Sequence, residues 1–238
     1  MTEKMTEKNN IKYHFFGKDC IIDRALLNRE DLLKSLDNKG FKCDELLFVN
    51  QIHSSEVVIV DEKNKLYDMH NLPKADAIVT NLKNIAIAVF TADCAPVFLF
   101  DKKKMVVAAL HAGWRGAKSG IVKQTIGAMK SLGAKNIKAI IGPMIQQNSY
   151  EISQEYFDDF LLEKENNKKF FKEKSEQGLY LFDLPAYVME KLQEEKISEI
   201  ENSAIDTYKN EESFFSFRRS AHRQEKDCGR NVSVILIN

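Results

Sequence analysis

Short apolar segments separated by polar or turn residues dominate the chain from residue 45 onward. Segments of this kind, rich in Val, Ile and Phe and bounded by turn residues, predict β-strands. We expect strands at 46–49, 57–60, 77–79, 85–90, 97–100, 105–110, 137–141, 179–184 and 232–237. Several are apolar at every position, which indicates that other layers cover both faces of the sheet.

Apolar residues recur at helical spacing between these strands. The spacing predicts helices over 23–38, 118–132 and 185–195, and Gly133 is placed to end the second of them. The charge-rich segment 153–176 predicts a helix followed by a solvent-exposed loop. These elements predict an α/β (α+β) fold, a layered sandwich of mixed β-sheet covered by helices.

The chain has 238 residues, of which 44% are hydrophobic and 29% charged, an ordinary globular composition. Neither a linker-like segment nor an internal repeat divides it, so we expect a single domain over residues 1–238. Residues 1–10 are polar and are expected to be disordered. They also lack an apolar signal core, and no apolar run approaches the ~20 residues that span a bilayer, so we expect a cytoplasmic protein that does not enter membranes.

Basic and acidic residues balance at 35 each, which argues against nucleic acid or an anionic membrane as a partner. The four cysteines are scattered without paired spacing, and in a reducing compartment we expect free thiols. Residue spacing does not distinguish a monomer from a homodimer.

Two segments at strand ends carry the densest chemistry: Thr-Ala-Asp-Cys-Ala-Pro at 91–96 and His-Ala-Gly-Trp-Arg-Gly at 111–116. A hairpin that pairs Asp101 with Lys104 would also place Cys94 opposite His111. Directly opposed strand residues have Cβ atoms ~5 Å apart. The spacing therefore predicts a Cys94–His111 contact.

Such a pair has three interpretations: a buried structural contact, a thiolate nucleophile with its base, or two metal ligands. The ionisable neighbours Asp93 and Arg115 favour a functional site. His53 also follows an apolar strand, and one thiolate with two imidazoles would form a tetrahedral zinc site with an open fourth position. Cys94, His111, Asp93 and Arg115 are therefore candidate catalytic residues.

Two arginines are candidate phosphate ligands. Arg115 lies where a strand leads into a helix, and a helix N-terminus with an arginine favours an anion. Arg218, in Ser-Phe-Arg-Arg at 216–219, is a second candidate. The alternative for both is ordinary surface charge.

A set of short motifs, taken in order, resembles the laccase-domain family over residues 45–237. This family was first described as multicopper polyphenol oxidoreductases and is associated with purine nucleoside phosphorylase and adenosine deaminase activity. The motifs are Asn-Gln-Ile-His at 50–53, Ala-Asp-Ala-Ile-Val-Thr at 75–80, the segments 91–96 and 111–116, Ile-Gly-Pro at 141–143, Ser-Tyr-Glu-Ile at 149–152, Phe-Ser-Phe-Arg-Arg at 215–219 and Gly-Arg at 229–230.

The resemblance implies zinc ligands at His53, Cys94 and His111, although a thiolate and imidazoles also accept copper. It implies purine nucleosides and phosphate as partners, with phosphorolysis of adenosine, inosine, guanosine and S-methyl-5′-thioadenosine and hydrolytic deamination of adenosine. Zinc would activate the water that attacks C6 of adenine. Arg115 and Arg218 would hold phosphate for attack at the ribose C1′, with Asp93 as an acid or base.

Three positions depart from the family pattern: Ser54 replaces a glycine, and Ser149 and Asp206 replace cysteines. None is a proposed ligand, but with only five histidines in the chain these losses argue against a copper polyphenol oxidase. An alternative function is a metal-free cysteine hydrolase or amidase, with Cys94 as nucleophile and His111 as base, acting on peptide-like cell-wall precursors. A third is a binding protein without turnover.

Overall fold

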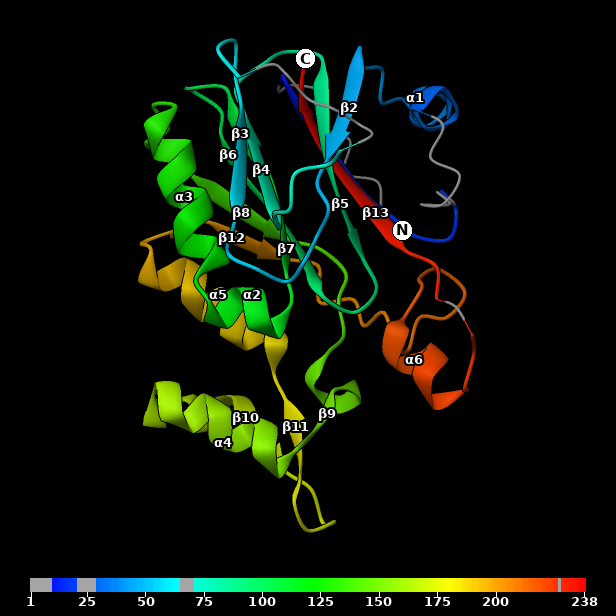
Figure 1. The fold of residues 1–238 in the computed structure, drawn as a ribbon, viewed down its shortest axis with the longest axis vertical. Coiled ribbons are helices and arrows are strands. Elements are labelled where there is room, and N and C mark those ends of the chain that lie inside the picture. The colour runs from blue at the N-terminus through cyan, green and yellow to red at the C-terminus, as the bar shows by residue number, and fades with distance from the viewer. Residues whose placement is uncertain (1–9, 21–28, 65–70, 227) are drawn as a thin grey trace.

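Two large β-sheets lie face to face in the computed structural model, which describes residues 10–20, 29–64, 71–226 and 228–238 (Figure 1). The four-stranded sheet has the order β1-β13-β5-β2 and the six-stranded sheet the order β12-β8-β6-β7-β4-β3. The strands of the first are β1 (Ile11–Phe16), β2 (Glu45–Phe48), β5 (Ile85–Thr91) and β13 (Asn231–Ile237). Those of the second are β3 (Val57–Val60), β4 (Ala77–Thr80), β6 (Ala95–Asp101), β7 (Val106–Ala112), β8 (Lys138–Ile141) and β12 (Ile200–Asn202).

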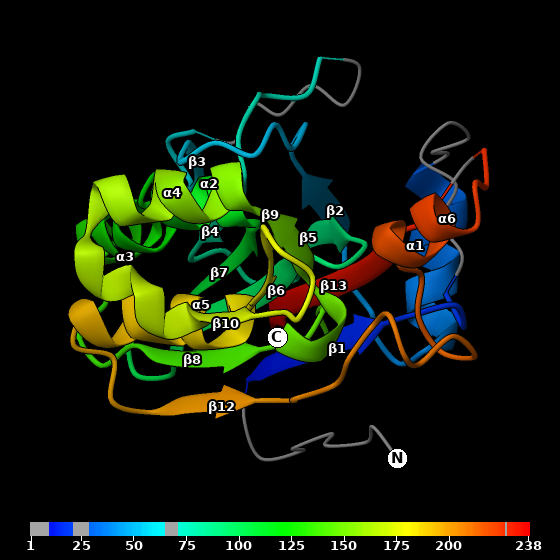
Figure 2. The ribbon, with the colours of Figure 1, turned by 90° about the horizontal axis from the view of Figure 1, so that it is seen from below.

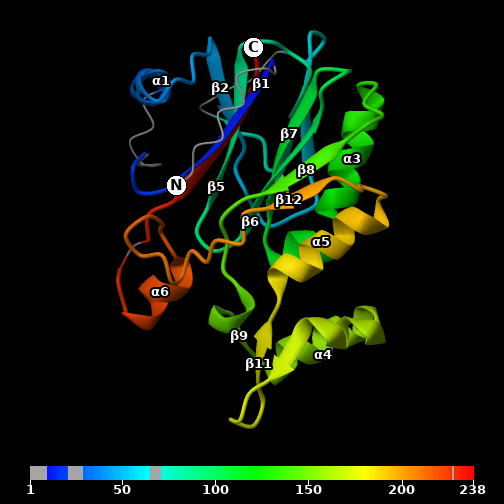
Figure 3. The same cartoon turned by 180° about the vertical axis from the view of Figure 1, so that it is seen from behind.

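Helices cover the outer face of each sheet. α3 (Ile121–Ser131) and α5 (Leu184–Glu194) lie on the six-stranded sheet, and α1 (Arg29–Asn38) lies beside the four-stranded sheet (Figures 1 and 3). A separate apolar cluster fills the space between the sheets, with Phe98 and Ile235 facing each other's sheet. Because both faces are covered, every residue of β6, β7 and β13 is buried, and the predicted layered α/β sandwich of mixed sheet is confirmed.

A third, smaller sheet, in the order β10-β11-β9, lies with α4 below the two large sheets in Figure 1 and toward the viewer in Figure 2. Its elements are β9 (Glu151–Ser153), α4 (Gln154–Glu163), η2 (Glu165–Phe170), β10 (Phe171–Glu173) and β11 (Leu179–Phe182). The predicted loop after the helix of 153–176 is therefore partly wrong. Phenylalanines of this segment pack in an aromatic cluster around Phe160 and Phe182, and this packing holds η2 and β10 in place.

The predicted hairpin of β6 and β7 forms, but with a shifted register. Pro96, not Cys94, lies opposite His111, and Asp101 pairs with Val106. The turn is longer than expected because the Asp101 carboxylate accepts the backbone N–H groups of Lys103 (2.8 Å) and Lys104 (3.0 Å). A shift of two residues preserves the side of the sheet, so the side chains of Cys94 and His111 still meet.

The helix predicted over 118–132 is confirmed as α3, which begins a few residues later than expected. Gly120, with a φ of +91°, separates it from the short α2 (Trp114–Lys118), which the sequence pattern did not predict. Gly133, with a φ of +90°, ends α3 as predicted. The N-terminal part of the helix predicted over 23–38 and the tail predicted to be disordered lie largely outside the described residues.

Several other elements had no counterpart in the sequence pattern. These are β1, β9, β10, β12, the short η1 (Gln147–Ser149) and α6 (Phe217–His222). None of the helices in the described part of the chain is long and apolar enough to cross a bilayer.

Candidate metal centre and pocket

The three predicted metal ligands come together from separate segments. His53 follows β2, Cys94 lies between β5 and β6, and His111 lies in β7. One ligand atom from each lies within 4.8 Å of the others. The distance from Cys94 Sγ to His53 Nε2 is 3.9 Å, and the two imidazole rings meet edge to face with centroids 4.7 Å apart.

The fully buried Asp76 organises this cluster from behind. Its Oδ1 lies 2.8 Å from His111 Nδ1 and accepts the backbone N–H of His53 at 3.0 Å. Its Oδ2 accepts the backbone N–H of Ser54 at 2.5 Å and the Ser54 hydroxyl at 2.8 Å. One carboxylate thus orients one histidine and holds the loop that carries the other, with His53 in a left-handed conformation of φ +60°.

Gly113 has no side chain, and this leaves room for the side chains of Cys94 and His53. A Cβ at this position would lie 2.9 Å from Cys94 Sγ and 3.1 Å from His53 Cδ2. The backbone conformation, with φ −71° and ψ 168°, suits any residue. The glycine is therefore required by the close approach of the two side chains and not by its backbone angles.

The residues present fit a zinc ion. The Sγ–Nε2 distance of 3.9 Å is shorter than roughly 4.4 Å, the sum of a Zn–S and a Zn–N bond. The hydrogen bond between Asp76 and His111 Nδ1 leaves Nε2 of the imidazole for the metal, an arrangement that metal-binding histidines commonly share. Ser54, which departs from the family pattern, adds a hydroxyl donor to Asp76 and does not disturb the ligands.

Charge within the metal-free cluster favours a thiolate. Burial alone raises the pKa of the Cys94 thiol, but the neighbouring His111 and His53 outweigh it and lower that pKa to about 6. Burial likewise lowers the pKa of His111, but Cys94 and Asp76 outweigh it and raise that pKa to about 9. Near pH 7 the pair is therefore a thiolate beside an imidazolium, and a binding metal has only to displace the imidazolium proton.

Metal-depleted protein should be alkylated at Cys94 by iodoacetamide with a rate that rises through a midpoint near pH 6. The half-buried thiol is accessible, and only the thiolate reacts. Peptide mass spectrometry across a pH series measures this rate. Zinc-loaded protein is the control and should be protected, whereas a midpoint near the ordinary thiol value of ~8.5 would contradict the charge assignment.

Asp93, the predicted acid or base, joins its own loop through hydrogen bonds to the segments of Thr207 and Arg218. Its carboxylate accepts the hydroxyls of Thr207 (2.7 Å) and Ser216 (3.0 Å) and the backbone N–H of Arg218 (2.6 Å). Asp93 has a φ of +84°, so its backbone is also held in the left-handed region. Arg219, next to Arg218, is buried and donates to three loop carbonyls, which gives it a structural position.

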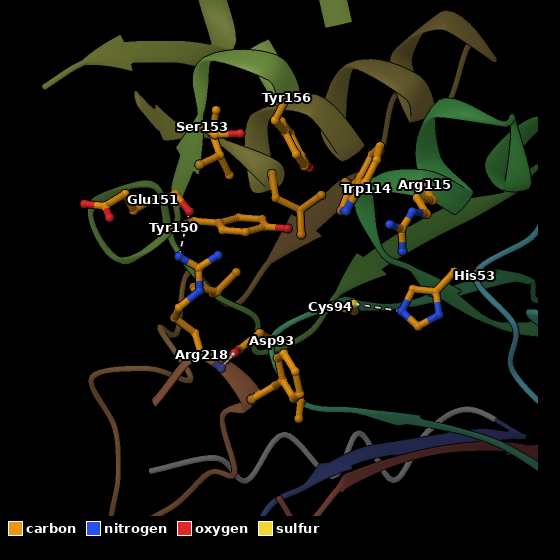
Figure 4. A pocket seen from close by; sticks show the side chains of 15 residues that line it. His53, Asp93, Cys94, Trp114, Arg115, Tyr150, Glu151, Ser153, Tyr156 and Arg218 are labelled. Atoms are coloured by element: carbon orange, nitrogen blue, oxygen red, sulfur yellow. Dashed lines mark hydrogen bonds between the residues drawn. The ribbon is translucent and has the colours of Figure 1, made fainter. Parts of the chain in front are cut away.

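His53 and Cys94 of the candidate metal site line a cavity of about 510 Å³. Figure 4 shows Arg115 on the same side as His53 and Arg218 on the opposite side, below Tyr150. The guanidinium of Arg115 lies over the Trp114 ring at 4.7 Å, and Arg218 lies over the Tyr150 ring at 5.3 Å and donates to the Glu151 carbonyl at 2.6 Å. The structure therefore brings both candidate phosphate ligands to one pocket.

Two other departures from the family pattern form a contact at the pocket's edge. The Ser149 hydroxyl donates to Asp206 Oδ2 at 2.6 Å, and Asp206 Oδ1 accepts the backbone N–H of Tyr208 at 3.0 Å. This contact joins the segment before Tyr150 to the loop that carries Thr207. At these two positions a hydroxyl and a carboxylate make the contact, where the family pattern has cysteines.

Sequence reasoning missed three residues of the site. Asp76 was quoted only within a motif, although a lone acid between alanines before an apolar strand is a signal that it has a buried partner. Tyr150 was likewise quoted without a role, and Tyr156 was not singled out. Neither tyrosine could be placed at the pocket, because only one strand of the third sheet, over 179–184, was predicted and its partners β9 and β10 were not.

The sequence and fold match proteins already known. A family model described as multi-copper polyphenol oxidoreductase laccase matches residues 8–238. A Rickettsia conorii protein named purine nucleoside phosphorylase is 41% identical over 229 residues, 96% of this chain and 92% of its own. A protein named adenosine deaminase, from an unknown prokaryotic organism, is 36% identical over 144 residues, 55% of each chain.

Solved structures agree with this match. A Neisseria meningitidis protein of the DUF152 family has a TM-score of 0.76 at 29% identity, covering 96% of this chain and 95% of its own. The family match spans both large sheets, the three-ligand cluster and the pocket. The chain therefore belongs to the multi-copper polyphenol oxidoreductase laccase family.

Proposed function

We propose that this protein is a zinc-dependent purine nucleoside enzyme. It would cleave adenosine, inosine, guanosine and S-methyl-5′-thioadenosine with phosphate and would hydrolytically deaminate adenosine, acting as both transferase and hydrolase. The observation that carries the proposal is the cluster of His53, Cys94 and His111 at the end of a pocket that also contains Arg115 and Arg218. Relatives named purine nucleoside phosphorylase and adenosine deaminase support both reaction types.

The ligand residues would hold the metal with one thiolate and two imidazoles. Asp76 keeps the Nδ1 side of His111 occupied, so that Nε2 faces Cys94 and His53. A zinc ion bound there would supply Lewis-acid activation of water near neutral pH. The open side of the cluster is the pocket, which His53 and Cys94 line.

The pocket residues would bind and orient the substrates. Arg218 is fixed before phosphate arrives, because its side chain is bonded to the Glu151 carbonyl and its backbone N–H to Asp93. Arg115 is exposed and lies over Trp114, from where its guanidinium can approach an anion in the pocket. The aromatic side chains of Trp114 and Tyr150 provide faces on which a purine ring can stack.

A cysteine hydrolase or amidase that acts on peptide-like cell-wall precursors is the second candidate. It is favoured by the lowered pKa of the Cys94 thiol beside His111, as expected for a nucleophile and its base. It leaves His53 without a role, whereas the metal centre uses all three residues. A copper polyphenol oxidase is supported least, since this is the single group of three ligands found within the described residues.

Metal content and activity of the wild type and of Cys94→Ala, measured on the same preparations, decide between these functions. Elemental analysis is expected to give about one zinc per wild-type chain and little in the variant, because two ligands bind zinc far more weakly than three. Phosphate-dependent release of adenine from adenosine should fall at least a hundredfold. A metal-free, fully active wild type that chelators do not inhibit would identify Cys94 as a nucleophile.

A further inference from the structure

The pocket is lined by three aromatic residues, Trp114, Tyr150 and Tyr156. Tyr156 reaches the pocket from the first turn of α4. Its ring lies 4.4 Å from the Trp114 ring and is stacked on Phe160 at 5.2 Å, so packing fixes its direction. Figure 4 shows the side chain pointing into the pocket with its hydroxyl toward Tyr150.

The Tyr156 hydroxyl is shielded from solvent and has the Tyr150 hydroxyl as its polar neighbour, but in the described part of the chain it makes no hydrogen bond of ordinary geometry. Other tyrosine hydroxyls in this region do have partners: that of Tyr187 donates to Glu163 at 3.1 Å and that of Tyr180 to Gln154 at 2.9 Å. Buried polar groups are rarely left without a partner, and those that are commonly mark a ligand position. Tyr156 lines the pocket, so a group bound there is placed to complete the hydrogen bonding of its hydroxyl.

The Tyr156 hydroxyl is protonated near neutral pH and can act as a hydrogen-bond donor. Burial and the neighbouring Tyr150 raise the pKa of its phenol well above the ordinary value. A neutral phenol is a weak ligand for phosphate beside two guanidinium groups, and the aromatic faces around it suit a planar ring. Aromatic side chains bind nucleobases by stacking, and a hydroxyl at the edge of the stack meets the ring's heteroatoms.

We propose that Tyr156 determines specificity for the base: its hydroxyl donates a hydrogen bond to a ring nitrogen of the purine, whose plane stacks against the aromatic wall. The inference rests on the proposed function and extends it by assigning the purine to the side of the pocket formed by α2 and α4. The phosphate then lies toward Arg218, and the nucleoside spans the pocket between them.

The test compares zinc-loaded wild type, Tyr156→Phe and the control Tyr180→Phe with adenosine as substrate. Tyr156→Phe should lower kcat/KM about tenfold, the effect of one neutral hydrogen bond, without changing the KM for phosphate. Its Tm should be equal to or above that of the wild type, because phenylalanine removes a buried hydroxyl that makes no hydrogen bond of ordinary geometry within the described residues. Tyr180→Phe, altered outside the pocket, should retain full activity.

Deaza analogues then identify the contact. Inhibition constants of 1-deaza-, 3-deaza- and 7-deazaadenosine are measured for the wild type and Tyr156→Phe. The variant should bind two of them about tenfold more weakly than the wild type, and should bind equally well the one that lacks the contacted nitrogen.

Three results with an active wild type would overturn the inference alone. An unchanged kcat/KM in Tyr156→Phe would show that the hydroxyl does not contact the substrate, a raised KM for phosphate would place it at the phosphate, and equal losses for all three analogues would place it at the ribose. A wild type without activity on any nucleoside would overturn the proposed function and this inference with it.

Discussion

Asp76→Asn is expected to bind zinc ten- to a hundredfold more weakly than the wild type and to lose a similar factor in nucleoside activity. The carboxylate accepts hydrogen bonds from both the loop of His53 and the ring of His111. Oδ1 faces the His53 N–H and the His111 ring, and Oδ2 faces the Ser54 N–H and hydroxyl. An amide of the same shape presents one oxygen and one NH₂ group, so a backbone N–H of this loop or the His111 ring must face another donor. The change thus misplaces a ligand without touching any of the three.

The same substitution should alter acid stability. Burial alone raises the pKa of Asp76, but hydrogen bonds from His111 and Ser54 outweigh it and lower that pKa to about 2. Because the folded-state pKa lies below the unfolded value of ~3.9, the carboxylate stabilises the fold above pH 4 and loses that contribution as pH falls toward 2. The contribution is about 2 kcal/mol, and Asp76→Asn should lack this part of the pH dependence.

Chelator competition measures the zinc affinity, and urea unfolding of metal-free protein between pH 2 and 7 measures the stability. Asp101→Asn is the matched control. Asp101 is also fully buried and accepts four backbone N–H groups, but it lies at the far end of β6 from Cys94. It should lose stability and keep its zinc. Wild-type zinc affinity in Asp76→Asn would show that the carboxylate does not position the ligands.

Local pattern was sufficient to predict the layers and the meeting of Cys94 with His111. Side chains alternate along a strand with period two, so an error of two residues in the register still placed both on one side of the sheet. The error itself came from the Asp101 side chain, whose bonds to the turn lengthen the hairpin loop. An error of one residue would have separated the pair.

The rest of the site depends on contacts between distant segments. Asp93 meets Thr207, more than a hundred residues further along the chain, and Asp76 meets two ligand segments at once. Of the third sheet, the strand predicted over 179–184 is confirmed as β11. Its partners β9 and β10 were missed because they are short and because the charges around Phe160 and Phe171 indicate a solvent-exposed face. Those rings instead pack on one another, and this packing positions Tyr156 at the pocket.

Gly113→Ala is expected to abolish tight zinc binding while leaving the fold intact. The added Cβ would lie 2.9 Å from Cys94 Sγ, closer than real Cβ contacts, and 3.1 Å from His53 Cδ2, so two ligands must move apart. Alanine suits the backbone angles of this position. A loss of zinc affinity would therefore come from the contact of the added Cβ with Cys94 and His53 and not from backbone strain. We expect at least a tenfold weaker zinc affinity and a matching loss of adenine release.

Gly127→Ala provides the matched control for this substitution. Gly127 lies within α3, and a Cβ there would meet no other heavy atom within 4 Å. Alanine should stabilise the helix by about 1 kcal/mol and leave zinc affinity unchanged. Circular dichroism with thermal unfolding and chelator competition on both variants separates the two effects. Wild-type zinc affinity in Gly113→Ala would contradict binding of one ion by Cys94 and His53 in the observed arrangement, because the added methyl group collides with both side chains there.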